Sequence, residues 1–384
     1  MQTYPNLTDV HATQDEPLMI RAGGALKKLR ETAGEDFFTA LFTSYVNEDR
    51  MTAYKKEGAL DTAFSLGNTR FRLHIYKSGG KPAAAIRVLP ELSALPADPD
   101  KAFLDKLSAL EHGLVLITGP SGSGKSTTLA HILLTAVAKR PCHIVTLEDP
   151  VEYVISSDKA LVHQREIGED TPSFAEGVIE SLREDPDIIA VGEMRDAATI
   201  EAALTAAETG HLVFATLHTT RAKDACTRII HAFPSTRENE IRSILSSCLQ
   251  HVLTQRLCRP GKETFLMREI LTNVPAVSHL IREGKDEQIP SYMEMGLQNM
   301  RTLKQAAYGL KNISEGGEDE CQDGEKDGQC EEEDKAGIGK GAYRFSFEFC
   351  FLPVVLGDAV EFFGERACHF SDLNQGGEEA GKGA

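Results

Sequence analysis

A glycine-rich loop constrains the fold of this chain more than any other feature. The stretch "ITGPSGSGKSTT" (117–128) fits the phosphate-binding pattern G-x-x-x-x-G-K-[ST] from Gly119 to Ser126. An apolar run, "GLVLIT" (113–118), precedes it, and apolar residues follow it at helical spacing. A strand, a tight loop and a helix in this order predict a phosphate site formed by backbone N–H groups at a helix N-terminus.

Each residue type in the loop suits contact with a nucleotide. Glycine lets backbone N–H groups approach phosphate oxygens, Lys125 is expected to reach the β- and γ-phosphates, and the Ser126 hydroxyl is expected to ligate Mg²⁺. The chain has no N-K-x-D segment, which GTPases use to specify guanine, so ATP is the expected nucleotide. The expected ATP-binding residues are Gly119, Pro120, Ser121, Gly122, Ser123, Gly124, Lys125, Ser126 and Thr127.

Short apolar runs recur after the loop, at 142–148, 187–192 and 211–218, with helical patterns between them. Runs that are apolar throughout are typical of strands buried on both faces, and their alternation with helices predicts a parallel sheet flanked by helices. Ligands of such sheets bind at the carboxyl ends of the strands. Polar residues cluster at those ends in this sequence.

Two groups of acidic residues end strands near the loop. "TLEDPVEY" carries Glu148, Asp149 and Glu152, and "DPDIIAVGEMRD" carries Glu193 after Gly192. Acids at strand ends are often only solvated, but two such sites that frame a phosphate loop favour a nucleotide site. One carboxylate can hold Mg²⁺, directly or through water, and another can orient the attacking water.

Two histidines flank the last of these runs. His211 opens it, and His218 follows it in "ATLHTT". A single histidine more often has a structural role. At the carboxyl end of a strand beside a nucleotide, however, His218 can sense the γ-phosphate.

The rest of the chain predicts further parts. Strands are expected at 71–77 and 82–90, joined by a turn at Gly79–Gly80, and residues 222–312 are expected to be mainly helical. The expected domains are an N-terminal α+β domain at 1–92, a linker at 93–112, an ATPase domain with a helical C-terminal portion at 113–312, and an acidic, Gly-rich, disordered tail at 313–384.

Charge and cysteine usage exclude several classes of function. Residues 315–384 hold 18 acidic and 6 basic side chains, so most of the net charge of −17 lies there and the body is nearly neutral. A neutral body gives no electrostatic footprint for nucleic acid. The eight cysteines form no C-x-x-C pair, which argues against a zinc ribbon or a disulfide framework and suits the cytoplasm. We see no secretory leader and no apolar run long enough to insert into a membrane.

Four sequence blocks together resemble one family. "GPSGSGKSTT", "EDPVEY", "REDPDIIAVGEMRD" and "ALTAAETGHLVFATLHTT" are similar to the phosphate loop, Asp box, atypical Walker B segment and His box of the ATPases that drive type II secretion and type IV pili. The branch that retracts pili in twitching motility is the most similar. This resemblance implies an ATP-hydrolysing ring motor. Its expected fold has a RecA-like P-loop core, a smaller PAS-like N-terminal domain and a helical C-terminal part.

The resemblance also implies roles for single residues. Glu152 matches the catalytic base, Glu193 matches the residue that holds Mg²⁺ or its water, and Arg195 braces the site. Glu148 and Asp149 are expected to support the base, His211 and His218 match the His-box histidines, and Arg72 and Arg87 match arginines that reach a neighbouring subunit's nucleotide.

Partners and alternatives follow from the same resemblance. It implies a homohexamer in the cytoplasm, at the inner face of the membrane, that works with an inner-membrane pilus platform protein. The alternatives are a motor for pilus assembly or type II secretion and a regulator that binds nucleotide without hydrolysis. Assembly and secretion ATPases usually carry a longer N-terminal region and a four-cysteine zinc insert, and the absence of paired cysteines here favours retraction. The segment "AVSHLIRE" (276–283) argues the other way, because it departs from the helix of the retraction branch that it resembles.

Overall fold

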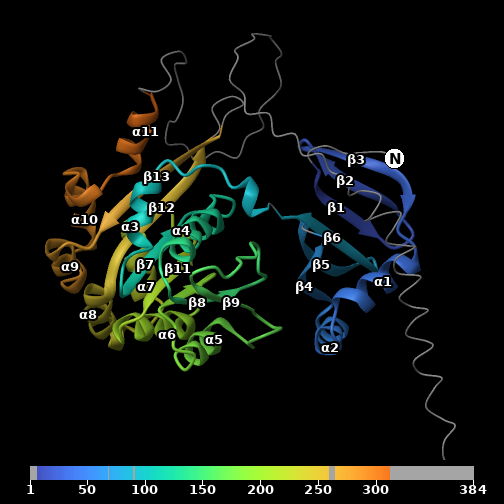
Figure 1. The fold of residues 1–384 in the computed structure, drawn as a ribbon, viewed down its shortest axis with the longest axis horizontal. Coiled ribbons are helices and arrows are strands. Elements are labelled where there is room, and N and C mark those ends of the chain that lie inside the picture. Colours follow the sequence, from blue (N-terminus) through green and yellow to red (C-terminus); the bar gives the residue numbers. More distant parts are fainter. Residues whose placement is uncertain (1–6, 68, 90, 259–263, 312–384) are drawn as a thin grey trace, which may run out of the picture. The chain divides into compact units, whose positions relative to one another are not determined.

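The computed structural model of the protein describes residues 7–67, 69–89, 91–258 and 264–311 (Figure 1). These residues divide into two units by their internal packing. The first unit holds residues 7–47 and 75–87, and the second holds residues 48–74 and 88–311. The acidic tail expected at 313–384 lies outside the described residues.

The first unit is built on antiparallel strands. β1 (Leu7–Thr13) pairs with β2 (Pro17–Ala22) on one side and with β6 (Lys81–Val88) on the other, and β3 (Ala25–Thr32) pairs with β2. Helix α1 (Glu35–Tyr45) contributes buried apolar side chains. Tight turns join neighbouring strands, as expected for an antiparallel arrangement.

Strand β5 (Thr69–Ser78) shows why the N-terminal pattern could be read from the sequence. Every second residue from Thr69 to Ile75 is buried, which is the period of a strand with one face on a core. β5 and β6 confirm the strands expected at 71–77 and 82–90. β4 (Ala59–Leu66) and α2 (Glu48–Glu57) precede β5, and the strand order in this sheet is β3-β2-β1-β6-β5-β4.

The second unit contains a seven-stranded sheet in the order β13-β12-β7-β11-β10-β8-β9. Neighbouring strands are parallel, except that β12 and β13 are antiparallel. The strands are β7 (Gly113–Thr118), β8 (His143–Glu148), β9 (Leu161–Glu166), β10 (Ile188–Val191), β11 (Leu212–Leu217), β12 (Leu249–Cys258) and β13 (Phe265–Thr272). The predicted parallel sheet flanked by helices is confirmed.

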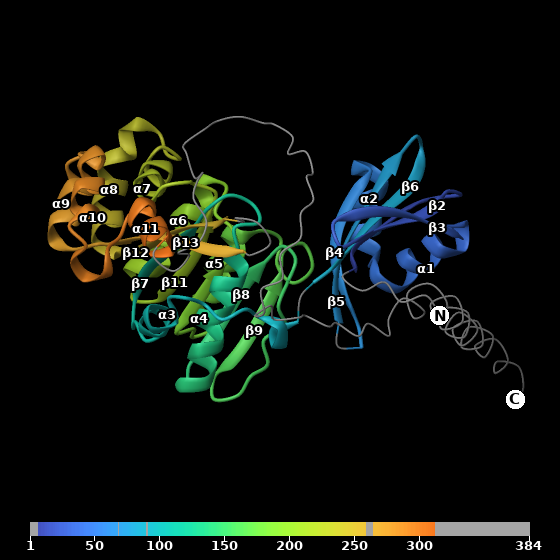
Figure 2. The ribbon, with the colours of Figure 1, turned by 90° about the horizontal axis from the view of Figure 1, so that it is seen from above.

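Helices cover both faces of this sheet. Leu114 and Leu116 of β7 pack into one hydrophobic cluster with α5 to α10, whereas Val115 and Ile117 pack into a second cluster with α3 and α4. Figure 2 shows α3 and α4 on one side of β7 and β11, and α6 and α7 on the other. Burial of both faces explains why β7 is an uninterrupted apolar run.

The helices of the second unit that follow β6 are mostly short. They are α3 (Lys101–Leu107), α4 (Lys125–Lys139), α5 (Phe174–Ser181), α6 (Ala197–Glu208), α7 (Ala222–Ile230), α8 (Glu238–Cys248), α9 (Pro275–Arg282), α10 (Ile289–Glu294) and α11 (Leu303–Lys311). Helix α3 lies within the segment expected as a linker at 93–112. Single 3₁₀ turns occur at Leu92–Ala94, Ser235–Arg237, Asp286–Gln288 and Leu297–Asn299.

The expectation that residues 222–312 are mainly helical was wrong in part. β12 and β13 lie in this range and extend the sheet beside β7. Their sequences mix polar and apolar residues, so they lack the apolar run that revealed β7. Pairing with the sheet outweighs the weak local preference of these residues.

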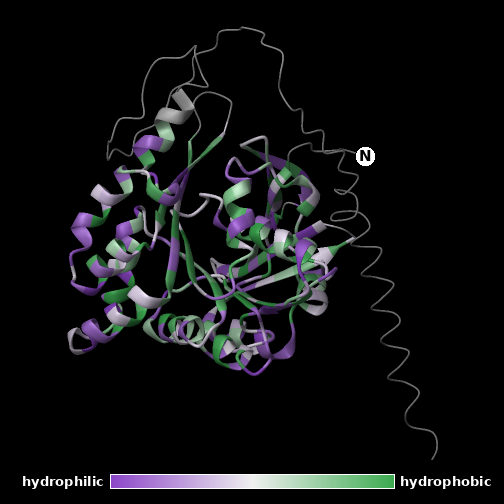
Figure 3. Ribbon diagram, turned by 60° about the vertical axis from the view of Figure 1, so that its left-hand side comes forward, coloured by the Kyte–Doolittle hydropathy of each residue, from purple (hydrophilic) through white to green (hydrophobic). Residues whose placement is uncertain are grey.

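Hydropathy along the ribbon agrees with this layering. Figure 3 shows hydrophobic residues (green) along the central strands and hydrophilic residues (purple) on outer turns and helices. Among the described helices, none has the length and apolar character that a membrane span requires.

Candidate active site

The phosphate loop connects β7 to helix α4, which begins at Lys125. Gly119 has φ of 145°, and a Cβ atom there would lie 2.4 Å from the Gln255 carbonyl oxygen and 2.6 Å from the Ser123 Oγ. Gly124 caps the helix with φ of 88°. Both positions therefore require glycine, the first because of close packing and the second because of its left-handed backbone.

Lys125 lies over the loop that precedes it. Its Nζ donates to the Gly119 carbonyl oxygen at 2.9 Å and lies 3.5 Å from the His218 Nδ1. Burial lowers the pKa of Lys125, while the carboxylates of Glu193 and Glu152 act in the opposite direction. Both sequence-predicted acids therefore lie close enough to the ammonium to influence it.

Glu193 and His218 meet because their strands are parallel neighbours. Glu193 follows β10, His218 follows β11, and the two side chains are 2.8 Å apart from Oε1 to Nε2. Arg195 binds the other Glu193 oxygen at 2.7 Å. Burial acts to raise the pKa of Glu193, but Arg195, His218 and Lys125 outweigh it and lower that pKa. Glu193 therefore stays ionised and can attract a cation or a metal-bound water.

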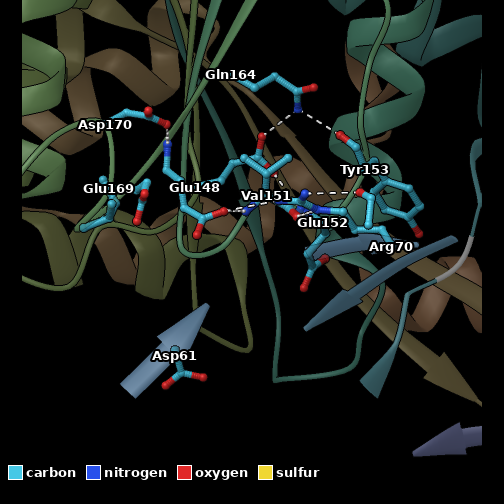
Figure 4. Close-up of polar contacts among 12 residues, drawn as sticks. Asp61, Arg70, Glu148, Val151, Glu152, Tyr153, Gln164, Glu169 and Asp170 are labelled. Carbon is cyan, nitrogen blue, oxygen red and sulfur yellow. Dashed lines mark hydrogen bonds and ion pairs between the residues drawn. The ribbon is translucent and has the colours of Figure 1, made fainter. Parts of the chain in front are cut away.

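Glu148 is held by its surroundings (Figure 4). It accepts hydrogen bonds from the Thr146 hydroxyl at 2.7 Å and from the Gln164 amide at 3.0 Å. The backbone N–H of Glu152 donates to its second oxygen at 3.4 Å. Burial raises the pKa of Glu148 in spite of these hydrogen bonds. These contacts suit a carboxylate that fixes the following loop rather than one that accepts a proton from water.

The residue before Glu152 is held through both its N–H and its carbonyl group. The Val151 N–H donates to the Glu166 carboxylate at 3.3 Å, and its carbonyl accepts from the Arg70 Nε at 3.2 Å. Arg70 and Glu166 also form an ion pair, and Arg50 binds the other Glu166 oxygen. A backbone held at both its donor and its acceptor has little freedom to turn.

Gln164 fixes the residues after Glu152. Its amide nitrogen donates to the Tyr153 carbonyl at 2.8 Å, and its amide oxygen accepts from the Ile155 N–H at 2.7 Å. The Tyr153 hydroxyl also lies 3.1 Å from the Thr127 Oγ1 on helix α4. The loop that carries Glu152 is thus tied to β9 and to the first turn of the helix that follows the phosphate loop.

Other predicted residues are farther from this arrangement. His211 comes just before β11, so it lies at the opposite end of that strand from His218; its Nδ1 is 3.1 Å from the Ala206 carbonyl. Asp149 is exposed beside Glu148. Arg72 and Arg87 are paired instead with acids on strands of the N-terminal sheet, Arg72 with Asp61 at 3.3 Å and Arg87 with Asp9 at 2.8 Å.

The oxygen atoms near the loop suit a magnesium ion that arrives with nucleotide. The Ser126 side chain is exposed on the first turn of α4. The Glu193 carboxylate has a lowered pKa, to which the charge of Lys125 contributes, and therefore stays ionised. Within the described part of the chain, no three His, Cys, Asp or Glu side chains gather as a metal cage. Mg²⁺ usually keeps several waters and takes one or two protein oxygens together with phosphate oxygens, so the residues fit it.

The sequence did not reveal Gln164, Glu166, Arg70 or Gln255, which hold the loops from outside. Gln164 and Glu166 are two residues apart on β9 and so lie on one face of that strand. Each of these side chains binds the backbone of a loop that lies elsewhere in the sequence, so no local pattern indicates the contact. Only a three-dimensional pairing identifies such contacts.

The chain is similar to a known family and to several known proteins. The model of the family described as "Type II/IV secretion system protein" matches residues 83–324. A twitching motility protein of Neisseria gonorrhoeae is 42% identical over 300 residues, which are 76% of this chain and 80% of that protein. The type IV pilus retraction ATPase PilT of Pseudomonas aeruginosa is 40% identical over 309 residues, which are 79% of this chain and 90% of that protein.

A solved structure is similar as well. The pilus retraction motor PilT with bound ADP is 40% identical, covers 80% of this chain with 90% of its own length, and superposes with a TM-score of 0.71. The type II secretion system protein E of Pseudomonas aeruginosa is more distant, with 32% identity over 66% of this chain.

Proposed function

Because the chain belongs to the type II/IV secretion system protein family, we propose that it is an ATP-hydrolysing motor that powers the retraction of a type IV pilus. One observation carries the choice of retraction. Identity to the retraction ATPase is 40% over 79% of this chain, whereas identity to a type II secretion protein E is 32% over 66%. Two relatives named for twitching or pilus retraction match 76% and 79% of the chain, whereas other type II secretion proteins E match at 43% and 41% identity over only 42% of it.

The phosphate loop supplies the nucleotide site in this proposal. Residues 119–127 bind the phosphates of ATP through backbone N–H groups and the helix N-terminus. Lys125 contacts the β- and γ-phosphates, and Ser126 ligates Mg²⁺, with Glu193 holding the ion through water. The lowered pKa of Glu193, which keeps this carboxylate charged, supports its role.

Glu152 is the proposed general base that orients and deprotonates the attacking water. Its loop is fixed at Val151 and Tyr153, and its charge acts on Lys125 across the site. Precise placement is what a base requires, because proton transfer depends on hydrogen-bond geometry. Glu148 and Asp149 support this loop, and His218 and Arg195 hold Glu193 in position.

The working form in this proposal is a ring, a homohexamer in which Arg72 and Arg87 reach a neighbour's nucleotide. An arginine supplied in this way typically accelerates phosphoryl transfer about 10³–10⁵-fold. Each subunit of this ring would have a RecA-like ATPase domain at 113–312, a linker at 93–112 and a PAS-like domain at 1–92. His211 keeps its proposed role as a His-box residue, although it precedes β11 and therefore lies at the opposite end of that strand from His218.

The proposal extends to location and partner. The motor acts in the cytoplasm at the inner face of the membrane, on an inner-membrane platform protein at the base of the pilus. The names of the similar proteins support this, since a pilus retraction motor has to act where the filament is anchored.

The number of surface pili tests retraction against its alternatives. In cells that lack this gene, we expect more pili and loss of twitching, both restored by the wild-type gene but not by Lys125→Ala. Cells without pili would instead mean that the protein drives assembly. Restoration by Glu152→Gln, which removes the proposed base and leaves the phosphate loop unchanged, would favour a regulator that binds nucleotide without hydrolysing it.

A further inference from the structure

A chain of three buried side chains lies beneath the phosphate loop. Gln255 on β12 donates from its Nε2 to the Ser123 carbonyl at 2.8 Å and accepts on its Oε1 from the Thr128 hydroxyl at 3.1 Å. The Thr128 Oγ1 accepts in turn from the Arg268 Nη2 at 2.9 Å. These three side chains, here named the loop relay, are at most 1% exposed. None of them lies within the pattern from Gly119 to Ser126, although Thr128 ends the longer block "GPSGSGKSTT".

The far end of the loop relay is anchored to the segment before α3. Arg268 binds both oxygens of Asp98, at 2.9 and 2.8 Å, and one oxygen of Asp100 at 2.7 Å. Burial acts to raise the pKa of Asp98, but Arg268 outweighs it and lowers that pKa. Asp98 and Asp100 lie in the stretch that leads from β6 into the ATPase sheet. The relay therefore joins this stretch to the phosphate loop.

Every hydrogen bond in the relay runs in one direction. The Ser123 carbonyl can only accept, so the Gln255 amide must present its N–H groups to it and its oxygen to Thr128; the Thr128 hydroxyl then donates to that oxygen and accepts from Arg268, which can only donate. The orientation of the glutamine amide is thereby fixed. A reversed amide would set its oxygen against the Ser123 carbonyl oxygen.

The consequence for the loop follows from the planarity of the peptide bond. The Ser123 carbonyl and the Gly124 N–H belong to one trans peptide unit, so they point in opposite directions. Because Gln255 draws the carbonyl toward β12, the Gly124 N–H faces the inner side of the loop, where phosphate binds. A peptide that turned over would present a carbonyl oxygen to the phosphate and repel it.

We propose that Gln255, Thr128 and Arg268 are positioning residues that hold the Gly124 N–H toward the nucleotide phosphates and couple its orientation to the Asp98–Asp100 segment. This rests on the proposed ATP-binding function of the loop. A shift of the segment before α3 therefore changes nucleotide affinity, and nucleotide binding resists such a shift.

Thr128 offers the sharpest test because its hydroxyl group can be replaced by a methyl group without a change of side-chain shape. In the full chain, Thr128→Val removes the hydroxyl and keeps the shape, and Thr128→Ser keeps the hydroxyl. Thr254→Val is the matched control, because Thr254 is next to Gln255 on β12, equally buried, and bonded to Thr118 rather than to the relay. Binding of MgADP is measured by calorimetry, KM and kcat for ATP by phosphate release, and folding by thermal unfolding.

We expect Thr128→Val to weaken MgADP binding about tenfold and to raise KM more than it lowers kcat, since it removes one oriented hydrogen bond. Thr128→Ser and Thr254→Val are expected to stay within about twofold of wild type. Unchanged affinity in Thr128→Val, or no rescue by Thr128→Ser, would overturn the proposal. If the wild-type chain itself binds no MgADP, the proposed ATPase function fails instead.

A second pair of variants tests the coupling and does not depend on Thr128→Val folding. Asp98→Asn weakens the anchor of Arg268, and Asp286→Asn weakens a comparable buried pair with Arg242, for which the structure gives no bond to the loop. Both are expected to lower the melting temperature, but only Asp98→Asn is expected to weaken MgADP binding, about threefold. Equal affinity in the two variants would contradict the coupling.

Discussion

Glu148 and Glu152 are four residues apart, yet their surroundings suit different tasks. Glu148 accepts hydrogen bonds from Thr146, Gln164 and the Glu152 backbone, and burial raises its pKa. Glu152 contributes its backbone N–H to that arrangement, and its side chain acts on the charge of Lys125. Environment therefore separates a structural carboxylate from one that can serve as a base, although both belong to one short motif.

Replacing Glu152 by glutamine tests this assignment. Glu152→Gln keeps the size of the side chain and removes the proton acceptor, so we expect ATP turnover to fall about 10²–10⁴-fold. ATP binding is expected to stay within about threefold of wild type, because the loop that binds the phosphates is unchanged. Phosphate release and calorimetric binding measure the two effects.

Glu176→Gln, on the exposed first turn of α5, is the control for the same change of charge. It should leave both turnover and binding unchanged. Turnover at the wild-type rate in Glu152→Gln would assign the base elsewhere.

The strands that the sequence did not reveal, β9 and β12, carry the side chains that brace the loops of the site. β7, β8, β10 and β11 were predicted because helices bury both of their faces, which leaves an apolar run. β9 and β12 carry Gln164, Glu166 and Gln255, which face loops rather than helices. The polar residues that brace the site are the same ones that interrupt the apolar pattern.

The phosphate loop, in contrast, was predictable because all of its essential residues are local. Gly119, Gly124 and Lys125 occupy one turn between a strand and a helix, and the spacing of the motif encodes that geometry. The partner of the loop on β12 is more than a hundred residues away along the chain, at Gln255. No local pattern indicates a contact of that kind.

Replacing Gln164 tests whether β9 fixes the loop that carries Glu152. Gln164→Met removes hydrogen bonds to Tyr153, Ile155 and Glu148 while keeping the side-chain length. Because the loop of Glu152 then loosens, we expect kcat to fall about tenfold, with MgADP affinity unchanged within about twofold. Steady-state ATPase assays measure kcat, and calorimetry measures the affinity for MgADP.

His163→Gln changes the preceding residue, whose side chain lies on the opposite face of the strand and touches His143, so it is the matched control. A loss of MgADP affinity in Gln164→Met equal to its loss of kcat would show that β9 supports the phosphate loop as well, contrary to this division of tasks.

For the whole molecule, the proposed ring requires arginines that can leave their present partners. Arg72 is 40% exposed and paired with Asp61, and Arg87 is 65% exposed and paired with Asp9. Exposed ion pairs contribute only about 0–1 kcal/mol. Such a pair is too weak to prevent Arg72 from binding a neighbour's phosphate, whereas Arg87 would leave behind the Asp9 carboxylate, which is only 11% exposed.

Mixing two inactive variants tests whether Arg72 acts between subunits. Lys125→Ala is expected to lose ATP binding. Arg72→Ala is expected to lose most ATP turnover, while its own phosphate loop still binds ATP. In a ring assembled from equal amounts, half of the intact loops would face an intact arginine, so about a quarter of wild-type activity should return. Activity is measured by phosphate release after subunit exchange.

Mixing Lys125→Ala with Lys125→Ala, Arg72→Ala double-variant subunits provides the control and should stay inactive. If the two single variants also stay inactive together, although mixed rings form, Arg72 does not act in a neighbouring subunit.

The position of β12 behind the phosphate loop has a consequence for the synthesis of the chain. The loop is translated about a third of the way along the sequence, but the Gln255 carbonyl and amide that back it are translated much later. Arg268, which completes the relay, follows on β13. A nascent chain that ends before Leu249 therefore has the whole motif without its support. Contacts between such distant segments form late in folding. Full affinity for nucleotide should thus appear on the ribosome only after β13 has emerged.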